Sequence, residues 1–170
     1  QLLPADTTAV VPMDGFHFDD AVLNQRGLRS RKGAQETFDY PGFAALLGRI
    51  RMGEPDIAIP VFDRSMELSR AGAAIIGTDV KFVLVEGNYL LLDEKPWSEL
   101  GALFDFSIFV DVPRPELERR LMERWRGHGK SDDEARAWIA SNDMPNIERV
   151  LARRRNADLV IEPPLRNQNS

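Results

Sequence analysis

One short stretch, Val80 to Asn88, constrains the fold more than any other part of the chain. Its sequence, VKFVLVEGN, is apolar and rich in β-branched residues until it ends in Glu86-Gly87. A run this short and apolar predicts a strand that is buried on both faces of a parallel sheet. A carboxylate where such a strand leaves the core is unexpected, because burial of an unpaired charge is costly. Ligands bind at the carboxyl ends of strands in open α/β sheets, so Glu86 is a candidate metal ligand or reactive acid. The alternative is an acidic strand end that only caps the next turn or helix.

The size and composition of the chain fit one globular domain. Of its 170 residues, 43% are hydrophobic and 29% are charged, which is ordinary for such a domain. The net charge of −5 does not favour nucleic acid or an anionic membrane as a partner. The absence of cysteine excludes disulfides, thiolate metal sites and cysteine nucleophiles. No apolar run is long enough to span a membrane, and the N-terminus does not have the layout of a signal peptide, so we expect a cytoplasmic protein.

Strand-like and helix-like segments alternate along the chain, which predicts the α/β class with a parallel sheet. The expected strands and extended pieces are 7–13, 57–62, 80–85, 106–112 and 158–162, and 64–77 fits an edge hairpin or a loop. The expected helices are 41–52, 97–103, 114–126, 132–141 and 147–155, with a break at 142–146. The polar segment 16–37 is expected to be a long loop with one short helical piece, and loops of that length are usually functional or mobile.

Two of the expected strands end in an acid followed by a glycine. These pairs are Asp14-Gly15 and Glu86-Gly87. If the two strands are parallel neighbours, or one position apart, both carboxylates meet at the same edge of the sheet. Two acids in that position can divide the work, one accepting a substrate proton and the other holding Mg²⁺. We expect the glycines to let a ligand approach the backbone closely.

The helix that starts at Arg114 carries basic side chains near its end: Arg119, Arg120, Arg124, Arg126 and Lys130. Arg120 and Arg124 are i, i+4 neighbours beside the apolar stripe of the helix, which suits them to reach a phosphate across a cleft. The alternative is a solvated face with weak Glu116–Arg120 and Arg119–Glu123 pairs.

The tripeptide Gly129-Lys130-Ser131 is not a phosphate-binding loop. That motif needs a glycine five residues before its second glycine, and this position is Arg124. It also has to follow a buried strand, whereas here a helix precedes it. No other Gly-Lys-Ser/Thr occurs in the sequence, so the 170 residues contain no such loop.

Several motifs, in order and at consistent spacing, resemble one known family. They are DGFH at 14–17, ETFDYP at 36–41, IPVFDR at 59–64 and VLVEGN at 83–88, followed by the arginines of 120–126. Together they resemble the phosphoribulokinase/uridine kinase/pantothenate kinase group of P-loop kinases over about residues 8–162. The likeness is strongest to bacterial members described as fructose-transport or sugar kinases, in which DGFH, FDR and EGNYLL recur.

The resemblance implies a three-layer α/β/α fold like that of P-loop NTPases, with a mainly parallel sheet. It implies one kinase domain over 1–162, a lid at about 119–131 and a tail at 163–170. The implied activity is transfer of the γ-phosphoryl group of ATP, with Mg²⁺, to a hydroxyl of a sugar, a nucleoside or a pantothenate-like molecule. The expected partner is that small molecule, with no nucleic acid and no membrane, and a homodimer remains open.

The resemblance also implies a role for each matching residue. Asp14 resembles the base that takes the proton of the acceptor hydroxyl, and Glu86 the acid near Mg²⁺. Asp39 resembles an acid that hydrogen-bonds substrate hydroxyls, although capping of the next helix explains it nearly as well. Residues His17, Phe38, Phe62, Asp63 and Arg64 would line the acceptor pocket, and Arg120, Arg124 and Arg126 would close on the triphosphate. The two phenylalanines and His17 have a plain core role as the alternative, and Asn142 and Asn146 are explained by nucleotide contact or by a turn.

The sequence departs from the family at its start. The first strand, the phosphate loop and the first helix of the family are expected before Gln1. We therefore expect either the C-terminal part of a longer protein or the product of a truncated gene, with weak ATP binding and an exposed sheet position. Two alternatives to a kinase remain: a nucleoside triphosphate hydrolase of the same fold, and a non-catalytic binding module that has kept the acceptor pocket.

Overall fold

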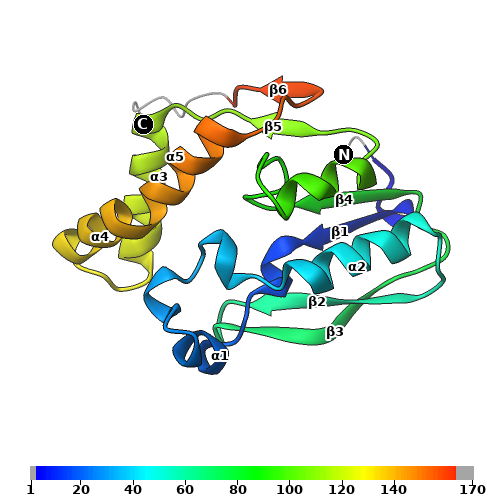
Figure 1. Ribbon diagram of the computed structural model, residues 1–170, viewed down its shortest axis with the longest axis horizontal. Helices are drawn as coiled ribbons and strands as arrows, with labels where there is room; N and C mark the ends of the chain where they lie inside the picture. The colour runs from blue at the N-terminus through cyan, green and yellow to red at the C-terminus, as the bar shows by residue number, and fades with distance from the viewer. Residues whose placement is uncertain (1–2, 164–170) are drawn as a thin grey trace. The chain divides into compact units, whose positions relative to one another are not determined.

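The computed structural model describes residues 3–163, and the chain divides into two compact units, Gln1–Leu103 and Phe104–Ser170 (Figure 1). Part of the tail expected at 163–170 lies outside the described residues. The elements of the first unit are β1 (Thr8–Pro12), α1 (Asp20–Gln25), α2 (Tyr40–Arg51), β2 (Ile57–Asp63), β3 (Leu68–Ile76) and β4 (Phe82–Glu86). Short 3₁₀ helices lie between them: η1 (Ala5–Thr7), η2 (Met13–Phe16), η3 (Arg29–Arg31), η4 (Gln35–Thr37) and η5 (Trp97–Leu103).

Strands β1 and β4 are parallel neighbours in the first unit (Figure 1). Their register runs from Thr8 opposite Phe82 to Pro12 opposite Glu86. Both strands therefore end at the same edge, as their acid-glycine ends predicted.

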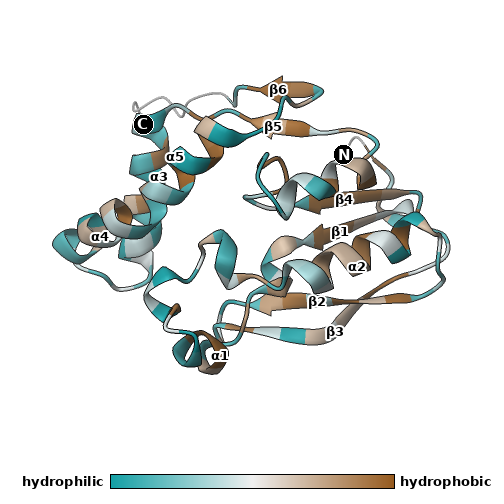
Figure 2. Cartoon of the chain, viewed as in Figure 1, coloured by the Kyte–Doolittle hydropathy of each residue, from teal (hydrophilic) through white to brown (hydrophobic). Residues whose placement is uncertain are grey.

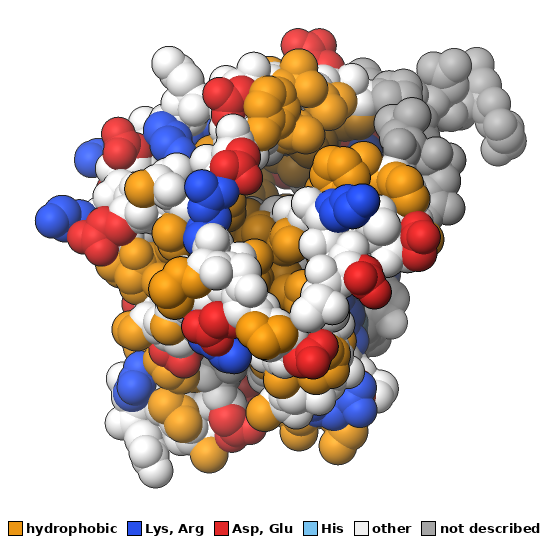
Figure 3. All heavy atoms as spheres, turned by 90° about the vertical axis from the view of Figure 1, so that its right-hand side faces the viewer, with side chains coloured by type: hydrophobic (Ala, Val, Ile, Leu, Met, Phe, Trp, Pro, Cys, Tyr) orange, Lys and Arg blue, Asp and Glu red, His pale blue; other side chains and the backbone are white. Residues whose placement is uncertain are grey.

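The expectation that β4 is buried on both faces is wrong. Val11 is fully buried, but Val10, Phe82 and Leu84 are 53%, 45% and 47% exposed. Val10 lies opposite Leu84, so these apolar side chains share one face of the strand pair. Apolar sequence predicts burial only if another layer covers the face, and the described residues leave this one open. Figure 3 shows one face of the molecule, on which hydrophobic side chains reach the surface among charged ones.

Strands β2 and β3 form an antiparallel hairpin, which settles the ambiguity at 64–77 in favour of a hairpin. The register shifts between Ile59 and Val61. Pro60 lies at this shift and has no amide N–H to give to a ladder, so a bulge is the place where a sheet tolerates it.

Helix α2 lies against the core of the first unit with one apolar face, which Figure 2 shows as brown stretches along a mixed helix. Phe43, Leu46 and Leu47 are buried on that face, as their helical spacing predicted. The Phe43 ring packs against those of Phe16, at 5.0 Å, and Trp97, at 6.4 Å. This aromatic core holds the segment after β1 in place.

The second unit contains β5 (Ile108–Val110), α3 (Arg114–Gly127), α4 (Asp132–Trp138), a π-helix (Ile139–Asp143), α5 (Met144–Arg153) and β6 (Leu159–Ile161). Strands β5 and β6 are parallel. The prediction of a buried strand at 106–112 is wrong in extent and in burial, since Ile108 and Val110 are 51% and 55% exposed. Helices α3, α4 and α5 lie beside one another in this unit (Figure 1).

The helix break expected at 142–146 is also wrong. The chain continues from α4 to α5 through the π-helix, and the Met144 amide donates to the Ile139 carbonyl. Pro145 lies just after the π-helix, and the wider turn there accommodates a residue without an amide N–H. No helix among residues 3–163 is both long and apolar enough to cross a membrane.

Candidate active site

Two carboxylates lie at the shared edge of β1 and β4. Asp14 is in the 3₁₀ helix that directly follows β1, and Glu86 is the last residue of β4, opposite Pro12. Partial burial and the negative charge of Asp14 both raise the pKa of Glu86, while the Arg64 guanidinium acts in the opposite direction. The sequence predicted that the two carboxylates meet at this edge, and the effect of the Asp14 charge on the pKa of Glu86 follows from that position.

The glycines after these acids are required by packing within the protein, and their expected role in the approach of a ligand stays a prediction. A Cβ on Gly15 would lie 2.5 Å from the Pro60 carbonyl oxygen of β2. A Cβ on Gly87 would lie 2.5 Å from Cβ of Met13. The close approach that needs glycine here is therefore made by the protein's own packing, which the local sequence does not reveal.

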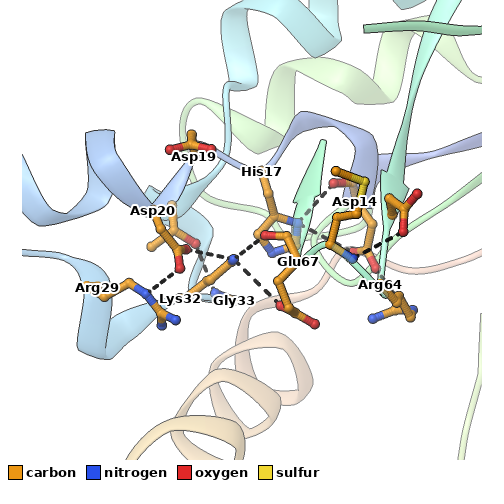
Figure 4. A network of polar contacts seen from close by, with 12 residues as sticks. Asp14, His17, Asp19, Asp20, Arg29, Lys32, Gly33, Arg64 and Glu67 are labelled. Atoms are coloured by element: carbon orange, nitrogen blue, oxygen red, sulfur yellow. Dashed lines mark hydrogen bonds and ion pairs between the residues drawn. The ribbon is translucent and has the colours of Figure 1, made fainter. Parts of the chain in front are cut away.

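Asp14 is bound directly by Arg64 (Figure 4). The Arg64 Nη2 donates to Asp14 Oδ2 at 2.6 Å, and the Arg64 side chain is 57% exposed. Arg64 stands in the turn between β2 and β3, so the hairpin brings it to the end of β1. The structure thus brings together two residues that lie fifty positions apart in the sequence.

His17 lies beside Asp14 and between aromatic rings. Its ring is 4.0 Å from that of Phe38 and 5.1 Å from that of Phe62. His17 Nδ1 lies 3.0 Å from the Asp14 carbonyl oxygen, so a neutral Nδ1–H tautomer donates there and leaves Nε2 as an acceptor. Burial lowers the pKa of His17, helped by the charges of Lys32 and Arg64 and opposed by Asp14. The residue is suited to accept a hydrogen bond from a hydroxyl.

The two phenylalanines of the expected pocket differ in burial. Phe38 is only 4% exposed and packs edge-on against Tyr89 and Trp97, so it belongs to the core as well as to the wall beside His17. Phe62 is half-buried near the end of β2. A role of either ring in substrate binding stays a prediction.

Asp39 and Asp63 both fix the backbone. Asp39 Oδ1 accepts from the Gly42 amide at 3.1 Å and caps α2, as the alternative reading expected. Asp63 Oδ1 accepts from Ser65 N at 3.0 Å, Ser65 Oγ at 2.6 Å and Met66 N at 3.2 Å. Asp63 therefore shapes the turn that carries Arg64, and substrate contacts of both acids stay predictions.

Sequence reasoning missed a second charged cluster next to this pocket (Figure 4). Lys32 Nζ donates to Asp20 Oδ1 at 2.8 Å and to the Glu67 carbonyl at 3.2 Å, and lies 3.7 Å from Glu67 Oε2. Arg29 also binds Asp20, at 2.8 Å. This cluster ties the segment after β1 to the tip of the β2–β3 hairpin. The basic run in segment 26–32 was the available signal, but its partners lie far away in the sequence.

The lid arginines belong to the second unit, where each has a contact of its own. Arg120 Nε donates to Glu116 Oε1 at 2.6 Å, which confirms the expected pair. Arg126 binds both oxygens of Asp132, at 2.7 and 2.8 Å, and Arg124 lies 5.6 Å from the centre of the Trp125 ring. The role of these arginines at a triphosphate stays a prediction, as does nucleotide contact by Asn142 and Asn146.

The donors at the sheet edge fit Mg²⁺. No group of three or more His, Cys, Asp or Glu residues within residues 3–163 forms a ready cation site. Mg²⁺, however, is usually held by one or two carboxylates together with substrate phosphates and water. Glu86 and Asp14 offer such oxygen atoms, and their mutual repulsion is the kind that a cation relieves.

Comparison with known proteins places this geometry in a family. No family model matches the chain. An uncharacterized protein of Escherichia coli, YggC, is 40% identical over 160 residues, which cover 94% of this chain and 65% of YggC. An "ATP-dependent kinase-like protein" of Aspergillus versicolor, notR', is 33% identical over 84% of this chain and 88% of its own length. A pantothenate kinase of Coxiella burnetii is 28% identical over 90% of this chain and 57% of its own. The chain therefore spans about two thirds of YggC and less of the pantothenate kinase.

A solved structure agrees with these relatives. A protein of Silicibacter described as a "putative fructose transport system kinase" is 44% identical, with a TM-score of 0.87 over 91% of this chain and 74% of that chain. This likeness to solved structures shows a P-loop kinase fold. The chain belongs to the phosphoribulokinase/uridine kinase/pantothenate kinase group of P-loop kinases, as its motifs indicated.

Proposed function

We propose that this chain forms the acceptor and metal side of an ATP-dependent small-molecule kinase. The reaction is transfer of the γ-phosphoryl group of ATP to a hydroxyl of a sugar, a nucleoside or a pantothenate-like molecule. The observation that carries the proposal is the parallel pairing of β1 with β4, which sets Asp14 and Glu86 at one edge of the sheet. Membership of a kinase family supports it.

Asp14 acts on the acceptor in this proposal. An acceptor hydroxyl that lies beside the carboxylate gives up its proton to Asp14 as its oxygen attacks the phosphoryl group. His17 Nε2 accepts a hydrogen bond from a second hydroxyl and so orients the acceptor, because Nδ1 is engaged by the Asp14 carbonyl. The half-buried Phe62 ring forms an apolar wall beside this position and helps to exclude water.

Glu86 is the residue that would hold Mg²⁺. Partial burial and then the negative charge of Asp14 raise its pKa, more than the Arg64 charge lowers it, and a bound cation would oppose both effects. Bound Mg²⁺ supplies neutralisation of the phosphate charge, which is the main requirement of phosphoryl transfer.

The activity also requires a phosphate-binding loop, and residues 1–170 contain no GxxxxGK[ST]. We propose that a segment outside these residues contributes it. The chain spans 65% of YggC, so at least one relative carries additional sequence. Val10, Phe82 and Leu84 form an exposed apolar face on which a further layer of the fold would pack.

Phosphoryl transfer by the full-length gene product that includes these residues tests the proposal. Mg-ATP is supplied with a panel of sugars, nucleosides and pantothenate, and phosphorylated acceptors are detected by mass spectrometry. Loss of the base in Asp14→Asn lowers transfer by about 10²–10⁴-fold. The matched control Asp79→Asn removes an exposed carboxylate from the loop before β4 and leaves the rate unchanged.

Two results would replace the proposal. Phosphate release that needs no acceptor and is unaffected by Asp14→Asn favours a nucleoside triphosphate hydrolase. Acceptor binding without any Mg-ATP binding by the full-length product favours a non-catalytic module.

A further inference from the structure

The segment 18–37 forms a long loop that starts and ends beside the proposed acceptor position. His17 and Phe38 form an isolated antiparallel bridge at its base. Near its end, the Gly33 carbonyl accepts from the hydroxyl of the buried Tyr89 at 2.7 Å. The loop is therefore anchored to the core of the first unit at its base and near its end.

Lys32 gives this loop a further anchor, on the turn between β2 and β3 (Figure 4). Its amine donates to Asp20 Oδ1 at 2.8 Å and to the Glu67 carbonyl at 3.2 Å, and Glu67 Oε2 lies 3.7 Å away. The Lys32 side chain is only 11% exposed, so salt and water screen these contacts little. One amine thus joins the start of α1 to the turn that follows β2.

The backbone of Glu67 has a conformation that needs such support. Its φ of 53° lies in the left-handed region, which is uncommon and costly for a residue other than glycine. In this conformation its carbonyl accepts from Lys32. Asp63 holds the other side of the turn through the amides of Ser65 and Met66. Lys32 therefore supports the side of the turn that Asp63 does not reach.

The turn carries two of the groups that surround the proposed base. Arg64, at its start, binds Asp14 Oδ2 at 2.6 Å. The ring of Phe62, at the end of β2, lies 5.1 Å from that of His17, and Lys32 Nζ lies 5.4 Å from its centre. Displacement of the turn would therefore move a wall of the pocket away from His17.

The two sides of the Lys32 contact differ in strength. Asp20 is also bound by Arg29, at 2.8 Å, so its carboxylate is held within the loop. The Glu67 side chain is 55% exposed, and its carboxylate is the more distant partner of the amine. Opening of the contact therefore separates Lys32 from Glu67 and leaves it on Asp20.

Resting on the proposed kinase function, we propose that Lys32 is a positioning residue that latches the loop 18–37 to the β2–β3 turn and so holds the acceptor pocket closed. An acceptor enters when the contact with Glu67 opens, and closure of the same contact brings Phe62 against it. Lys32 thus acts on acceptor binding through the turn, and it takes no part in proton transfer.

Hydrogen exchange of the full-length gene product, followed by mass spectrometry without any ligand, tests the latch. Lys32→Met keeps an apolar stem of similar length and removes the charge. Exchange should then rise about tenfold or more both in 20–32 and in 63–68, since a charged hydrogen bond joined the two segments. A role of Lys32 within the loop alone would raise exchange in 20–32 only.

Two further variants control for folding and for charge. Lys32→Arg keeps the positive charge and should restore most of the protection in 63–68. Arg49→Met removes a cation of the same unit that binds Glu54 at 2.7 Å, and it should change exchange in neither segment.

The transfer assay separates positioning from catalysis. Mg-ATP is supplied with the same panel of sugars, nucleosides and pantothenate, and the rate is measured against the concentration of each member that is phosphorylated. Lys32→Met should raise the acceptor KM about tenfold and change kcat much less, because Asp14 and Glu86 keep their places.

Unchanged exchange in 63–68 of Lys32→Met, a rise of the same size in helix α2, or a defect confined to kcat would each overturn the inference. These outcomes are distinct from failure of the proposed function. Joint loss of protection in both segments without transfer to any member of the panel would refute the kinase activity and leave the latch. Transfer by Lys32→Met with normal exchange in 63–68 would refute the latch alone.

Discussion

His17 shows how burial sets the charge of one residue in the site. Its imidazole is enclosed by Phe38 and Phe62 and stands near two cations, so the folded protein favours the neutral ring. The identity of this residue as a pocket ligand was predicted from its place beside Asp14 in a polar segment. The aromatic enclosure and the nearby Lys32 were not predictable, because they come from segments that only the fold brings together.

The lowered pKa of His17 makes stability depend on pH. The folded state binds fewer protons than the unfolded state between the folded pKa and about 6.5, so stability falls as the pH drops through this window. We expect His17→Gln to flatten the profile between pH 7 and 5 in urea unfolding. An undiminished loss of stability in the variant over this range would contradict the assignment.

Glu116, in the second unit, gives a dependence of the same sign at lower pH. Its carboxylate accepts from Arg119 and Arg120, and these hydrogen bonds lower its pKa to about 2. The resulting stability is fully present above about pH 4.5 and is lost as the pH falls toward 2. Glu116→Gln should therefore lower the urea midpoint at pH 7, with a difference that shrinks between pH 4.5 and 2.

The control for this prediction is Glu118→Gln, which removes a more exposed carboxylate of the same helix with one arginine partner, Arg114. Its effect at pH 7 should be smaller. An effect of Glu116→Gln that is equal at pH 7 and pH 2 would rule out the carboxylate charge as its cause.

At the scale of elements, the strands, most helices and the meeting of β1 with β4 were predictable. Short apolar runs and acid-glycine ends are local signals, and parallel pairing is what an α/β pattern favours. The exposure of Val10 and Leu84 was not predictable, since it depends on whether another layer covers their face. The π-helix was missed because Pro145 in sequence looks like a break, whereas the preceding turn can widen to accommodate it.

The packing of η2 against β2 gives a prediction at this scale. Gly15→Ala places a methyl group 2.5 Å from the Pro60 carbonyl, which is backbone and cannot simply rotate away. We expect a loss of about 1–3 kcal/mol in the free energy of unfolding, as for other overpacked sites. Gly48→Ala is the matched control, because its Cβ meets no atom within 4 Å inside α2.

The control should raise stability by about 0.5–1 kcal/mol, since alanine loses less entropy than glycine in a helix. Urea unfolding of both variants measures the difference. Equal effects of the two substitutions would show that the close approach at Gly15 does not matter.

At the scale of the whole molecule, the described residues present apolar strand side chains that no other described element covers. Val10, Phe82 and Leu84 in the first unit, and Ile108 and Val110 in the second, are all more than 40% exposed. The sequence predicted an uncovered sheet position through the family resemblance. An exposed strand with an apolar face is a template for association.

We therefore expect the 170-residue chain to self-associate at micromolar concentration in sedimentation velocity. Leu84→Lys should shift it toward the monomer by placing a charge on the exposed face of β4. Met66→Lys, which charges a 60% exposed side chain in the hairpin turn, is the control and should not. A monomeric wild-type chain, or equal effects of both substitutions, would show that this face is not the cause.

The central claim is that Asp14 and Glu86 form one phosphoryl-transfer site with separate roles. The rate of ³²P transfer from γ-labelled ATP to the acceptor, measured against Mg²⁺ concentration in the full-length gene product, tests it most directly. Asp14→Asn should lower the rate at every Mg²⁺ concentration, by about 10²-fold or more. Glu86→Gln should raise the Mg²⁺ concentration needed for half-maximal rate. Wild-type rates and wild-type Mg²⁺ dependence in both variants would contradict the account.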